Sequence, residues 1–501
     1  MERFLKRIIL GPFFWPLVFI FSLQRTIDAD LGWNIRIGEW IIKHGQIPHT
    51  DLFSFWAHNY PYVYHSWLSQ VLIYLVDNHF GLWGLTISFT GILVLSFYIW
   101  QHLIDELGIS RLWSRILMLI MAPTFFVSIL VRPQMFSLLF VCLLIYCLFH
   151  YRQNYKPLFF ILPTIFLAWV NLHGGYSIGF VIMIAFFTAE VWQGGQRGKM
   201  RQVFLSILLI IISFLATLVS PFGLQSYRQL LAMLVNPFYS RYIIEWLPLL
   251  ARGTQPLVFA LLVLGVLLLP FVFHLVKINW TIWGLTSALF IFTLRVNRLS
   301  LFLFIPLVVL LSQILSSLEN KLLPIVKHFG RFEKLYLKMA VLLLVISVLL
   351  KTGLNIDKIS QENQNDQAWG RGLQTIGLIF PVQAAKYLQG KPPLPRLFNN
   401  IGWGGYLIWK LPKQTVFGVG GMDSYKVDGR FLLEDYLRLC ATAKNYKQLM
   451  VNYQIESAIL PNDYPLAKTL DKDPRWEKIY QDNICVIFIK KGIKWEVKNG
   501  Y

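Results

Sequence analysis

Residues 8–36 read IILGPFFWPLVFIFSLQRTIDADLGWNIR, an apolar run followed at once by acidic and aromatic residues. The apolar part, from Ile8 to Leu23, follows a basic start, and no small-residue cleavage site comes after it. A cleaved signal peptide needs such a site, so the pattern predicts a signal anchor that stays in the membrane. The acidic and aromatic part then begins the first loop outside the first span.

The composition of the whole chain is typical of a membrane protein. Its 501 residues are 56% hydrophobic and only 14% charged, and the mean hydropathy is +0.53. Soluble domains carry about a quarter charged residues. The formal net charge of +20 resembles that of a nucleic-acid-binding protein, but the basic residues fall mostly in short loops between apolar runs. We therefore predict a membrane protein with no nucleic-acid partner.

Apolar runs long enough to cross a hydrocarbon core of about 30 Å occur about eleven times. The predicted spans are 8–27, 81–101, 115–131, 134–150, 158–171, 175–192, 203–219, 255–275, 279–294, 299–316 and 337–352. The shorter apolar stretch 66–76 is predicted to be an interfacial or re-entrant helix. The predicted fold class is thus an all-α polytopic membrane protein with about 11 transmembrane helices.

Basic residues are unevenly distributed between the two sides of these spans. Loops on the N-terminal side carry more of them: Arg3, Lys6, Arg7, Arg111, Arg115, Arg152, Lys156, Arg197, Lys199, Arg201, Lys277, Lys321, Lys327, Arg331, Lys334 and Lys338. The opposite loops carry fewer: Arg25, Arg36, Lys43, Arg132, Arg228, Arg241, Arg252, Arg295 and Arg298. Because cytoplasmic loops are enriched in Lys and Arg, the N-terminus is predicted to be cytoplasmic. An odd number of spans then places the C-terminal part outside.

After residue 352 no run is apolar enough to span a bilayer. We predict a transmembrane domain over 1–352 with a first outer loop at 28–67, a linker over 353–378 and a small extracytoplasmic α/β domain over 379–501. Its strands are predicted at Tyr406–Trp409, Thr415–Val419, Ala458–Leu460 and Cys485–Ile489, and its helices at 379–388, 430–439 and 443–453.

Two smaller features of this C-terminal domain also carry expectations. The motif Gly402-Trp403-Gly404-Gly405 has no phosphate-loop lysine and is predicted to form a tight turn beside an aromatic contact. Cys440 and Cys485 lie far apart in sequence, and the spacing leaves a disulfide between them open.

Unusual polar residues gather on one side of the predicted membrane. They fall at the outer ends of spans or in outer loops: Asp28, Asp30, Arg36, Asp51, His65, Arg132, Asn171, His173, Glu245, Arg295 and Arg298. Ionisable groups near membrane depth are costly unless they face protein or water, so each is a functional candidate. The inner loops hold mostly ordinary Lys and Arg.

The first outer loop holds the densest group of these residues. Residues 31–43 predict an amphipathic helix that lies in the interface. Asp30 precedes that helix, so its side chain would either cap the helix or act with Asp28 as a cation ligand or a base. Asp51 lies in a turn-like Pro-His-Thr-Asp-Leu context, which fits a structural role equally well.

The whole string of motifs resembles the GT-C superfamily of membrane glycosyltransferases, particularly bacterial relatives of the protein O-mannosyltransferase type. Besides the first loop, the resemblance rests on Val131-Arg132-Pro133-Gln134-Met135-Phe136-Ser137, Trp169-Val170-Asn171-Leu172-His173-Gly174-Gly175, Pro221-Phe222-Gly223, Glu245-Trp246 and Leu294-Arg295-Val296-Asn297-Arg298. The stretch Asn399–Leu407 also resembles the C-terminal domain of members of this group.

This resemblance implies an inverting transfer of a sugar from a polyprenyl-phosphate donor to a lipid, glycan or protein acceptor, at the outer face of a bacterial inner membrane. Asp28 or Asp30 would be the base, or the pair would bind a divalent cation such as Mg²⁺ or Mn²⁺. Arg132, Arg295 and Arg298 would balance the leaving phosphate, because guanidinium groups match phosphate bidentately. The remaining candidates for substrate binding are Arg36, Asp51, His65, His173 and Glu245.

Other interpretations remain for the same residues. His173 fits a helix-end cap, Glu245-Trp246 an interfacial anchor, and Arg295 and Arg298 fit snorkelling to headgroups. The chain departs from the family pattern at Ser66, where an acidic residue is expected before Trp67. The departure favours a non-catalytic component of an envelope polysaccharide pathway. A transporter or flippase for a lipid-linked saccharide is a further alternative, although it predicts polar groups at mid-membrane rather than at span ends.

Overall fold

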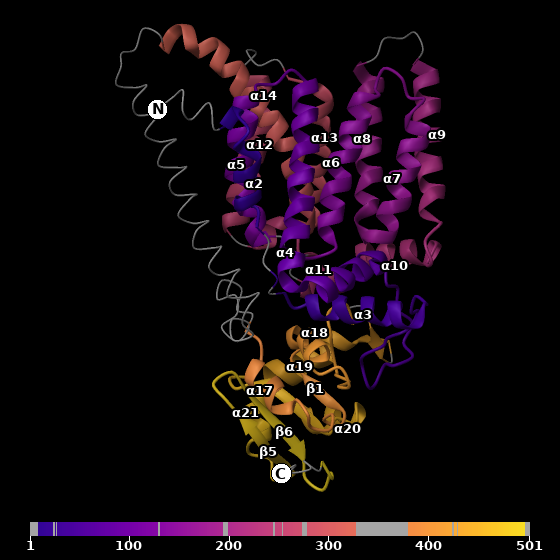
Figure 1. The fold of residues 1–501 in the computed structure, drawn as a ribbon, viewed down its shortest axis with the longest axis vertical. Coiled ribbons are helices and arrows are strands. Elements are labelled where there is room, and N and C mark those ends of the chain that lie inside the picture. The colour runs from indigo at the N-terminus through magenta and orange to yellow at the C-terminus, as the bar shows by residue number, and fades with distance from the viewer. Residues whose placement is uncertain are drawn as a thin grey trace. The chain divides into compact units, whose positions relative to one another are not determined.

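The computed structural model describes residues 9–23, 26, 28–128, 131–193, 199–243, 246–252, 254–272, 278–326, 379–422, 425–427 and 429–495. The predicted span 337–352 and the predicted linker 353–378 lie outside these residues. The described part is mostly helical, with a small sheet in its C-terminal part (Figure 1).

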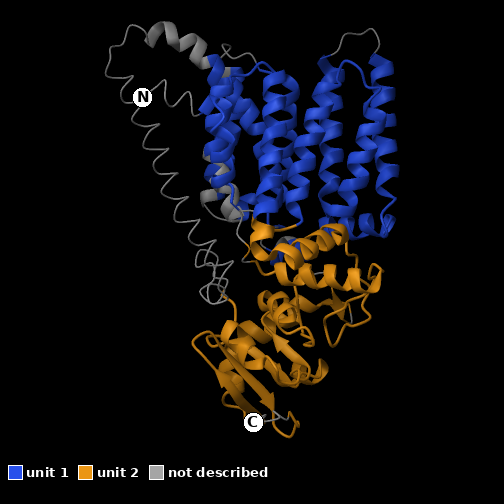
Figure 2. Ribbon diagram, in the orientation of Figure 1, with its two compact units in different colours: residues 1–24, 87–129, 133–356 blue, residues 25–86, 130–132, 357–501 orange. Residues whose placement is uncertain are grey.

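The chain divides into two compact units (Figure 2). One comprises residues 1–24, 87–129 and 133–356, and the other comprises 25–86, 130–132 and 357–501. The first loop and the C-terminal part therefore belong to the same compact unit.

The first unit consists of helices. They are α2 (Phe14–Phe21), the second half of α4 (Trp67–Glu106), α5 (Arg111–Ser128), α6 (Gln134–His150), α7 (Leu158–Leu172), η1 (Gly174–Tyr176), α8 (Ser177–Gln193), α9 (Lys199–Thr217), α10 (Leu224–Val235), α11 (Pro237–Tyr242), η3 (Leu249–Arg252), α12 (Thr254–Val272), α13 (Trp280–Arg295), η4 (Asn297–Leu299) and α14 (Ser300–Val326). α7 packs against α6 and α9, while α13 packs against α8 and α14.

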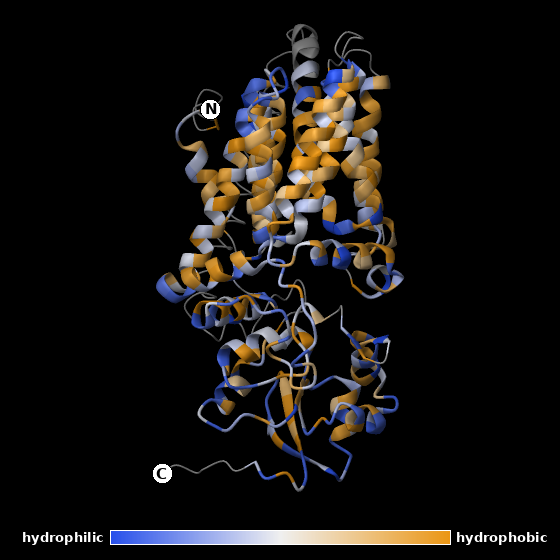
Figure 3. Cartoon of the chain, turned by 90° about the vertical axis from the view of Figure 1, so that its right-hand side faces the viewer, coloured by the Kyte–Doolittle hydropathy of each residue, from blue (hydrophilic) through white to orange (hydrophobic). Residues whose placement is uncertain are grey.

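These helices are strongly apolar, as their colouring in Figure 3 shows. Among the described helices, four are long and apolar enough to cross a membrane: Trp67–Glu106, Gly174–Gln193, Lys199–Thr217 and Asn297–Ser317. Shorter apolar helices lie at Gln134–His150, Leu158–Leu172 and Pro256–Phe271. The structure thus has the character of a helical membrane protein, and the number of about eleven spans stays a prediction.

The interfacial stretch predicted at 66–76, apart from Ser66, and the span predicted at 81–101 both fall within α4. Gly81 breaks this helix, because its φ of 60° and ψ of −162° are not helical. Glycine adopts a positive φ without the steric cost that other residues meet. The break therefore separates two helical segments where the sequence predicts two elements.

The second unit combines the first loop with a small α/β domain. Its elements are α3 (Leu31–His44), the start of α4, α17 (Val382–Leu388), β1 (Leu397–Asn399), α18 (Ile401–Lys410), β2 (Lys426–Val427), β3 (Arg430–Phe431), α19 (Leu432–Thr442), α20 (Tyr446–Asn452), β4 (Ser457–Pro461), α21 (Pro465–Leu470), β5 (Trp476–Gln481) and β6 (Cys485–Lys490). The helix predicted over 31–43 agrees with α3.

The four-stranded sheet has the order β1-β4-β6-β5. β1 pairs with β4 in parallel, with Phe398 opposite Ala458, and the other pairs are antiparallel. A parallel pair needs a crossover, which α18, α19 and α20 supply in the sequence between β1 and β4. All residues of β4 but the last are buried, as expected for an inner strand.

Two predictions about the motif around Gly404 are wrong. Tyr406–Trp409 is helical rather than a strand, and Gly402–Gly405 is not a tight turn, because both belong to α18. The glycines have a packing role instead: a Cβ at Gly404 would collide with Gly418 O, and one at Gly405 would collide with Ala29 O. Glycine is used where two backbones approach this closely.

Two further expectations are settled by the described residues. Thr415–Val419 forms no strand and makes only isolated parallel bridges, from Val416 to Ser54 and to Leu397. Cys440 and Cys485 are free and buried, so no disulfide joins them.

The first loop is tied to the C-terminal part by backbone hydrogen bonds. Val416 N donates to Phe53 O (3.0 Å), and Phe55 N donates to Val416 O (3.3 Å). Trp56 Nε1 donates to Phe417 O (2.8 Å). Because Phe417 N also donates to Leu397 O (2.8 Å), the segment around Val416 connects the first loop to β1.

Candidate functional site

The structure brings Asp28, Asp30 and Arg132 together. Arg132 Nε pairs with Asp28 Oδ2, and Arg132 Nη2 donates to Asp28 Oδ1 (3.0 Å). Arg132 Nη2 also lies 3.6 Å from Asp30 Oδ2. The Asp28 side chain is 0% exposed, whereas that of Asp30 is 32% exposed. Two carboxylates separated by one residue therefore stand in different environments beside one guanidinium.

The backbone around these aspartates fixes Asp28 further. Asp30 N donates to Asp28 Oδ1 (2.7 Å), so that oxygen accepts two hydrogen bonds. Asp30 occupies the N-cap position of α3, but its side chain makes no capping hydrogen bond. The capping interpretation of Asp30 is therefore wrong, and its carboxylate is directed elsewhere.

The donor set around Asp28 does not fit a divalent cation held by both aspartates. Arg132 engages both oxygens of Asp28, and a cation next to a guanidinium is repelled by its charge. Among the described residues, no group of three or more His, Cys, Asp and Glu side chains could hold a metal ion. We therefore derive no step through a metal.

Asp51 lies in a fully hydrogen-bonded buried site. Its Oδ1 accepts from Phe53 N (3.0 Å), Ser54 N (2.7 Å) and Ser54 Oγ (2.7 Å), and its Oδ2 accepts from Tyr425 OH (2.8 Å). Burial, together with the nearby Asp51 charge, raises the pKa of Tyr425 well above its ordinary value. The phenol thus stays protonated and keeps donating to Asp51, which braces the first loop against the C-terminal part.

Replacing Asp51 by alanine is expected to destabilise the protein. Tyr425 OH and Ser54 Oγ would each lose a buried acceptor, at about 1–3 kcal/mol per unsatisfied group. The melting temperature of the purified protein in detergent measures the effect. The matched control is Asp471→Ala, because the Asp471–Lys478 pair (2.9 Å) is exposed and worth about 0–1 kcal/mol. Equal losses in both variants would contradict the bracing role.

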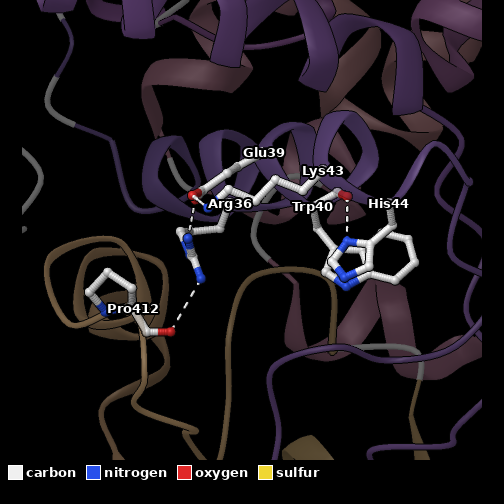
Figure 4. A network of polar contacts seen from close by, with 6 residues as sticks. All are labelled: Arg36, Glu39, Trp40, Lys43, His44 and Pro412. Carbon is white, nitrogen blue, oxygen red and sulfur yellow. Dashed lines mark hydrogen bonds and ion pairs between the residues drawn. The ribbon is translucent and has the colours of Figure 1, made fainter.

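Arg36 is engaged in a local network on α3 (Figure 4). Its Nη1 pairs with Glu39, and its Nη2 donates to Pro412 O (3.2 Å). Lys43 pairs with the same Glu39, and His44 contacts the Trp40 carbonyl (2.8 Å). The contact with Pro412 O ties α3 to the chain just after α18, while the other contacts lie within α3, so the structure places Arg36 in a bridging position.

His65 and Ser66 lie just before α4. His65 is half-buried, and Ser66 is buried. The Ser66 carbonyl accepts from Ser69 Oγ (2.8 Å) and Gln70 N (3.0 Å), which starts the helix. Serine is a favoured residue immediately before a helix.

In the first unit, His173 forms a buried network with two residues that sequence reasoning did not single out. Ser137 Oγ lies 2.6 Å from His173 Nδ1 and accepts from Trp169 Nε1 (2.7 Å). Gly175 N also donates to His173 Nδ1 (3.1 Å). Because Nδ1 accepts, the proton of the neutral imidazole is on Nε2. The sequence did contain a sign of this network, since Ser137, Trp169 and His173 all belong to motifs that carry the family resemblance.

The remaining candidates lie near the end of α13 or outside the described residues. Arg295 is the last residue of α13 and is exposed. Arg298 lies in η4, and Gln134, with its amide oxygen turned toward the guanidinium, accepts from Arg298 Nε (3.3 Å). Glu245 lies outside the described residues.

The fold and the site define a helical membrane protein whose first loop, joined to a small α/β domain, holds two carboxylates around one arginine. No protein-family model and no curated protein sequence matches the chain. Solved structures with a similar fold include those of the oligosaccharyltransferase of Archaeoglobus fulgidus.

The apo form of that transferase has a TM-score of 0.56 at 12% identity, covering 92% of this chain and 70% of the transferase. Its complex with an inhibitory peptide and a dolichol-phosphate has a TM-score of 0.56 at 13% identity, covering 91% and 70%. Its complex with Zn and sulfate has a TM-score of 0.50 at 14% identity, covering 91% and 68%. At these identities the likeness shows that the chain shares the fold of this transferase.

Proposed function

We propose that the protein is a glycosyltransferase that takes a sugar from a polyprenyl-phosphate donor at the outer face of a bacterial inner membrane. The observation that carries this proposal is the unequal pair of carboxylates beside Arg132: Asp28 is buried and bound on both oxygens, and Asp30 is partly exposed. The fold shared with an oligosaccharyltransferase that binds a peptide and a dolichol-phosphate supports it.

In this mechanism Asp30 is the base, because its carboxylate reaches solvent while that of Asp28 does not. Asp30 takes the proton of the acceptor hydroxyl as the oxygen attacks the anomeric carbon. The new bond forms between the acceptor oxygen and that carbon, and the bond to the phosphate oxygen breaks. The electron pair leaves with polyprenyl phosphate, and the configuration at the anomeric carbon inverts.

Asp28 is the positioning residue in this proposal. Its hydrogen bond from Asp30 N and its paired contacts with Arg132 hold the start of α3 in place. Arg295 and Arg298 stay the proposed ligands of the leaving phosphate, since guanidinium groups bind phosphate with two parallel hydrogen bonds. Arg36, His65, His173 and Glu245 stay proposed substrate-binding residues, with Arg36 and His173 now placed in the networks described above.

The donor class is tested with purified protein in vesicles that contain a radiolabelled polyprenyl-phosphate hexose. The expected result is release of polyprenyl phosphate with transfer of the label, while the nucleotide sugar of the same hexose is not consumed. Lipid, glycan and peptide acceptors are offered in separate reactions. An intact donor in all of them would contradict the proposal, and an intact donor moved across the bilayer would identify a flippase instead.

A further inference from the structure

The segment Gly418–Met422 is held in a fixed turn by the end of β1. Asn399, which is 0% exposed, accepts from Phe417 N (3.0 Å) and Gly418 N (3.1 Å) through Oδ1, and its Nδ2 donates to Gly418 O (2.8 Å). Val419 N lies 3.0 Å from Met422 Sδ. One buried side chain thus satisfies three backbone groups of Phe417 and Gly418, at the start of a segment that forms no strand of its own.

α18 packs between this turn and the start of α3. A Cβ at Gly404 would collide with Gly418 O, and one at Gly405 would collide with Ala29 O. The contact between α18 and the start of α3 is equally close from the α3 side, because a Cβ at Gly32 would collide with Gly405 O. Backbone therefore meets backbone along this line, and neither the turn nor residues 29–32 can shift independently of α18.

The backbone of this turn is in direct contact with the side chain of Asp30. A Cβ added at Gly420 would collide with Asp30 Oδ1, so the Gly420 backbone lies against that carboxylate. Gly421 has a φ of +85°, and a Cβ there would meet Tyr62 OH and the Trp33 ring. Gly420 itself has no positive φ, so its backbone accepts alanine and only the contact with Asp30 opposes one.

We propose that the glycine turn Gly418–Gly421 of the C-terminal domain positions the Asp30 carboxylate for proton transfer. This inference rests on the proposed function, because it assumes that Asp30 is the base. It gives the C-terminal domain a direct part in the site: Asn399 fixes the turn, and the turn limits where Asp30 Oδ1 can lie. Misplacement of a catalytic group by about 1 Å costs up to about 10²-fold in rate.

The test is a double-mutant cycle of Gly420→Ala and Asp30→Asn in the full-length protein. Gly420→Ala alone is expected to lower kcat about 10- to 100-fold, with the KM of the donor unchanged. In the Asp30→Asn background it is expected to change kcat less than about twofold, because the group it displaces no longer acts. Gly91→Ala, in α4 with nothing within 4 Å of its added Cβ, is the matched control and should retain activity.

The outcomes separate the two proposals. Full activity of Asp30→Asn would overturn the assigned base and the positioning role with it. Loss of activity in Asp30→Asn, with Gly420→Ala unaffected, would overturn the positioning role alone. If Gly420→Ala lowers kcat by the same factor in both backgrounds, the turn has a general structural role and the inference is wrong. Melting temperatures check folding. Adding Asp30→Ala to Gly420→Ala should raise the melting temperature again, because it removes the side chain with which the new Cβ collides.

Discussion

Replacement of Asp30 by asparagine is expected to lower kcat of sugar transfer about 10²- to 10⁴-fold, the usual contribution of a general base. The amide keeps the size of the carboxylate but cannot take the proton of the acceptor hydroxyl. Stability should change little, since the side chain is 32% exposed and makes no capping hydrogen bond. Initial rates at saturating donor and acceptor measure the first effect, and melting temperatures measure the second.

Asp28→Asn should behave differently from Asp30→Asn. Its amide oxygen can still accept from Asp30 N, but the paired contact with Arg132 loses its charge. Both kcat and the melting temperature are therefore expected to fall. Asp471→Asn, an exposed carboxylate paired with Lys478, is the control and should leave kcat unchanged. Wild-type rates in both Asp28→Asn and Asp30→Asn would show that neither carboxylate is the base.

Most of the long helices of the first unit could be predicted, because they are apolar runs bounded by polar residues or prolines, whereas α10 and α11 fall between the predicted spans. α6 follows the predicted span 134–150 residue for residue, and α13 agrees with 279–294 within a residue. Such segments form helices because they are buried in lipid or protein, and an apolar composition alone is enough to predict this burial.

The C-terminal part was harder to predict, because its glycines serve tertiary contacts. Three glycines within Gly402–Gly405 argue locally against a helix, yet α18 contains them all. The reason for Gly404 and Gly405 lies in the backbones of Gly418 and Ala29, which no local pattern reveals. Tertiary packing thus overrides helix propensity at this motif.

The candidate site could be predicted only as a set of residues on one side of the membrane. Asp28 and Arg132 are 104 residues apart in sequence, and the spacing says nothing of their pairing. The attachment of the first loop to Val416 was missed for a similar reason, since backbone hydrogen bonds in irregular segments leave no side-chain pattern. Asp51 looks the same in sequence whether it binds substrate or Tyr425.

Replacement of Arg132 by methionine is expected to destabilise the protein by about 3–5 kcal/mol, the cost of leaving a buried charge without its partner. The reason lies at Asp28, whose side chain is 0% exposed and would keep only the hydrogen bond from Asp30 N. The stability of Arg132→Lys should lie between those of the wild type and Arg132→Met, because lysine keeps the charge but lacks the planar fork that reaches both oxygens of Asp28. Thermal unfolding in detergent compares the three proteins.

A second substitution shows whether the unpaired carboxylate is the cause of that loss. Asp28→Asn combined with Arg132→Met removes both charges and keeps an acceptor for Asp30 N, so most of the stability should return. Transfer activity should stay low, because the guanidinium beside Asp30 Oδ2 is still missing. If the double variant is as unstable as Arg132→Met, the arginine stabilises the protein through its other contacts, and Asp28 is not held by charge pairing.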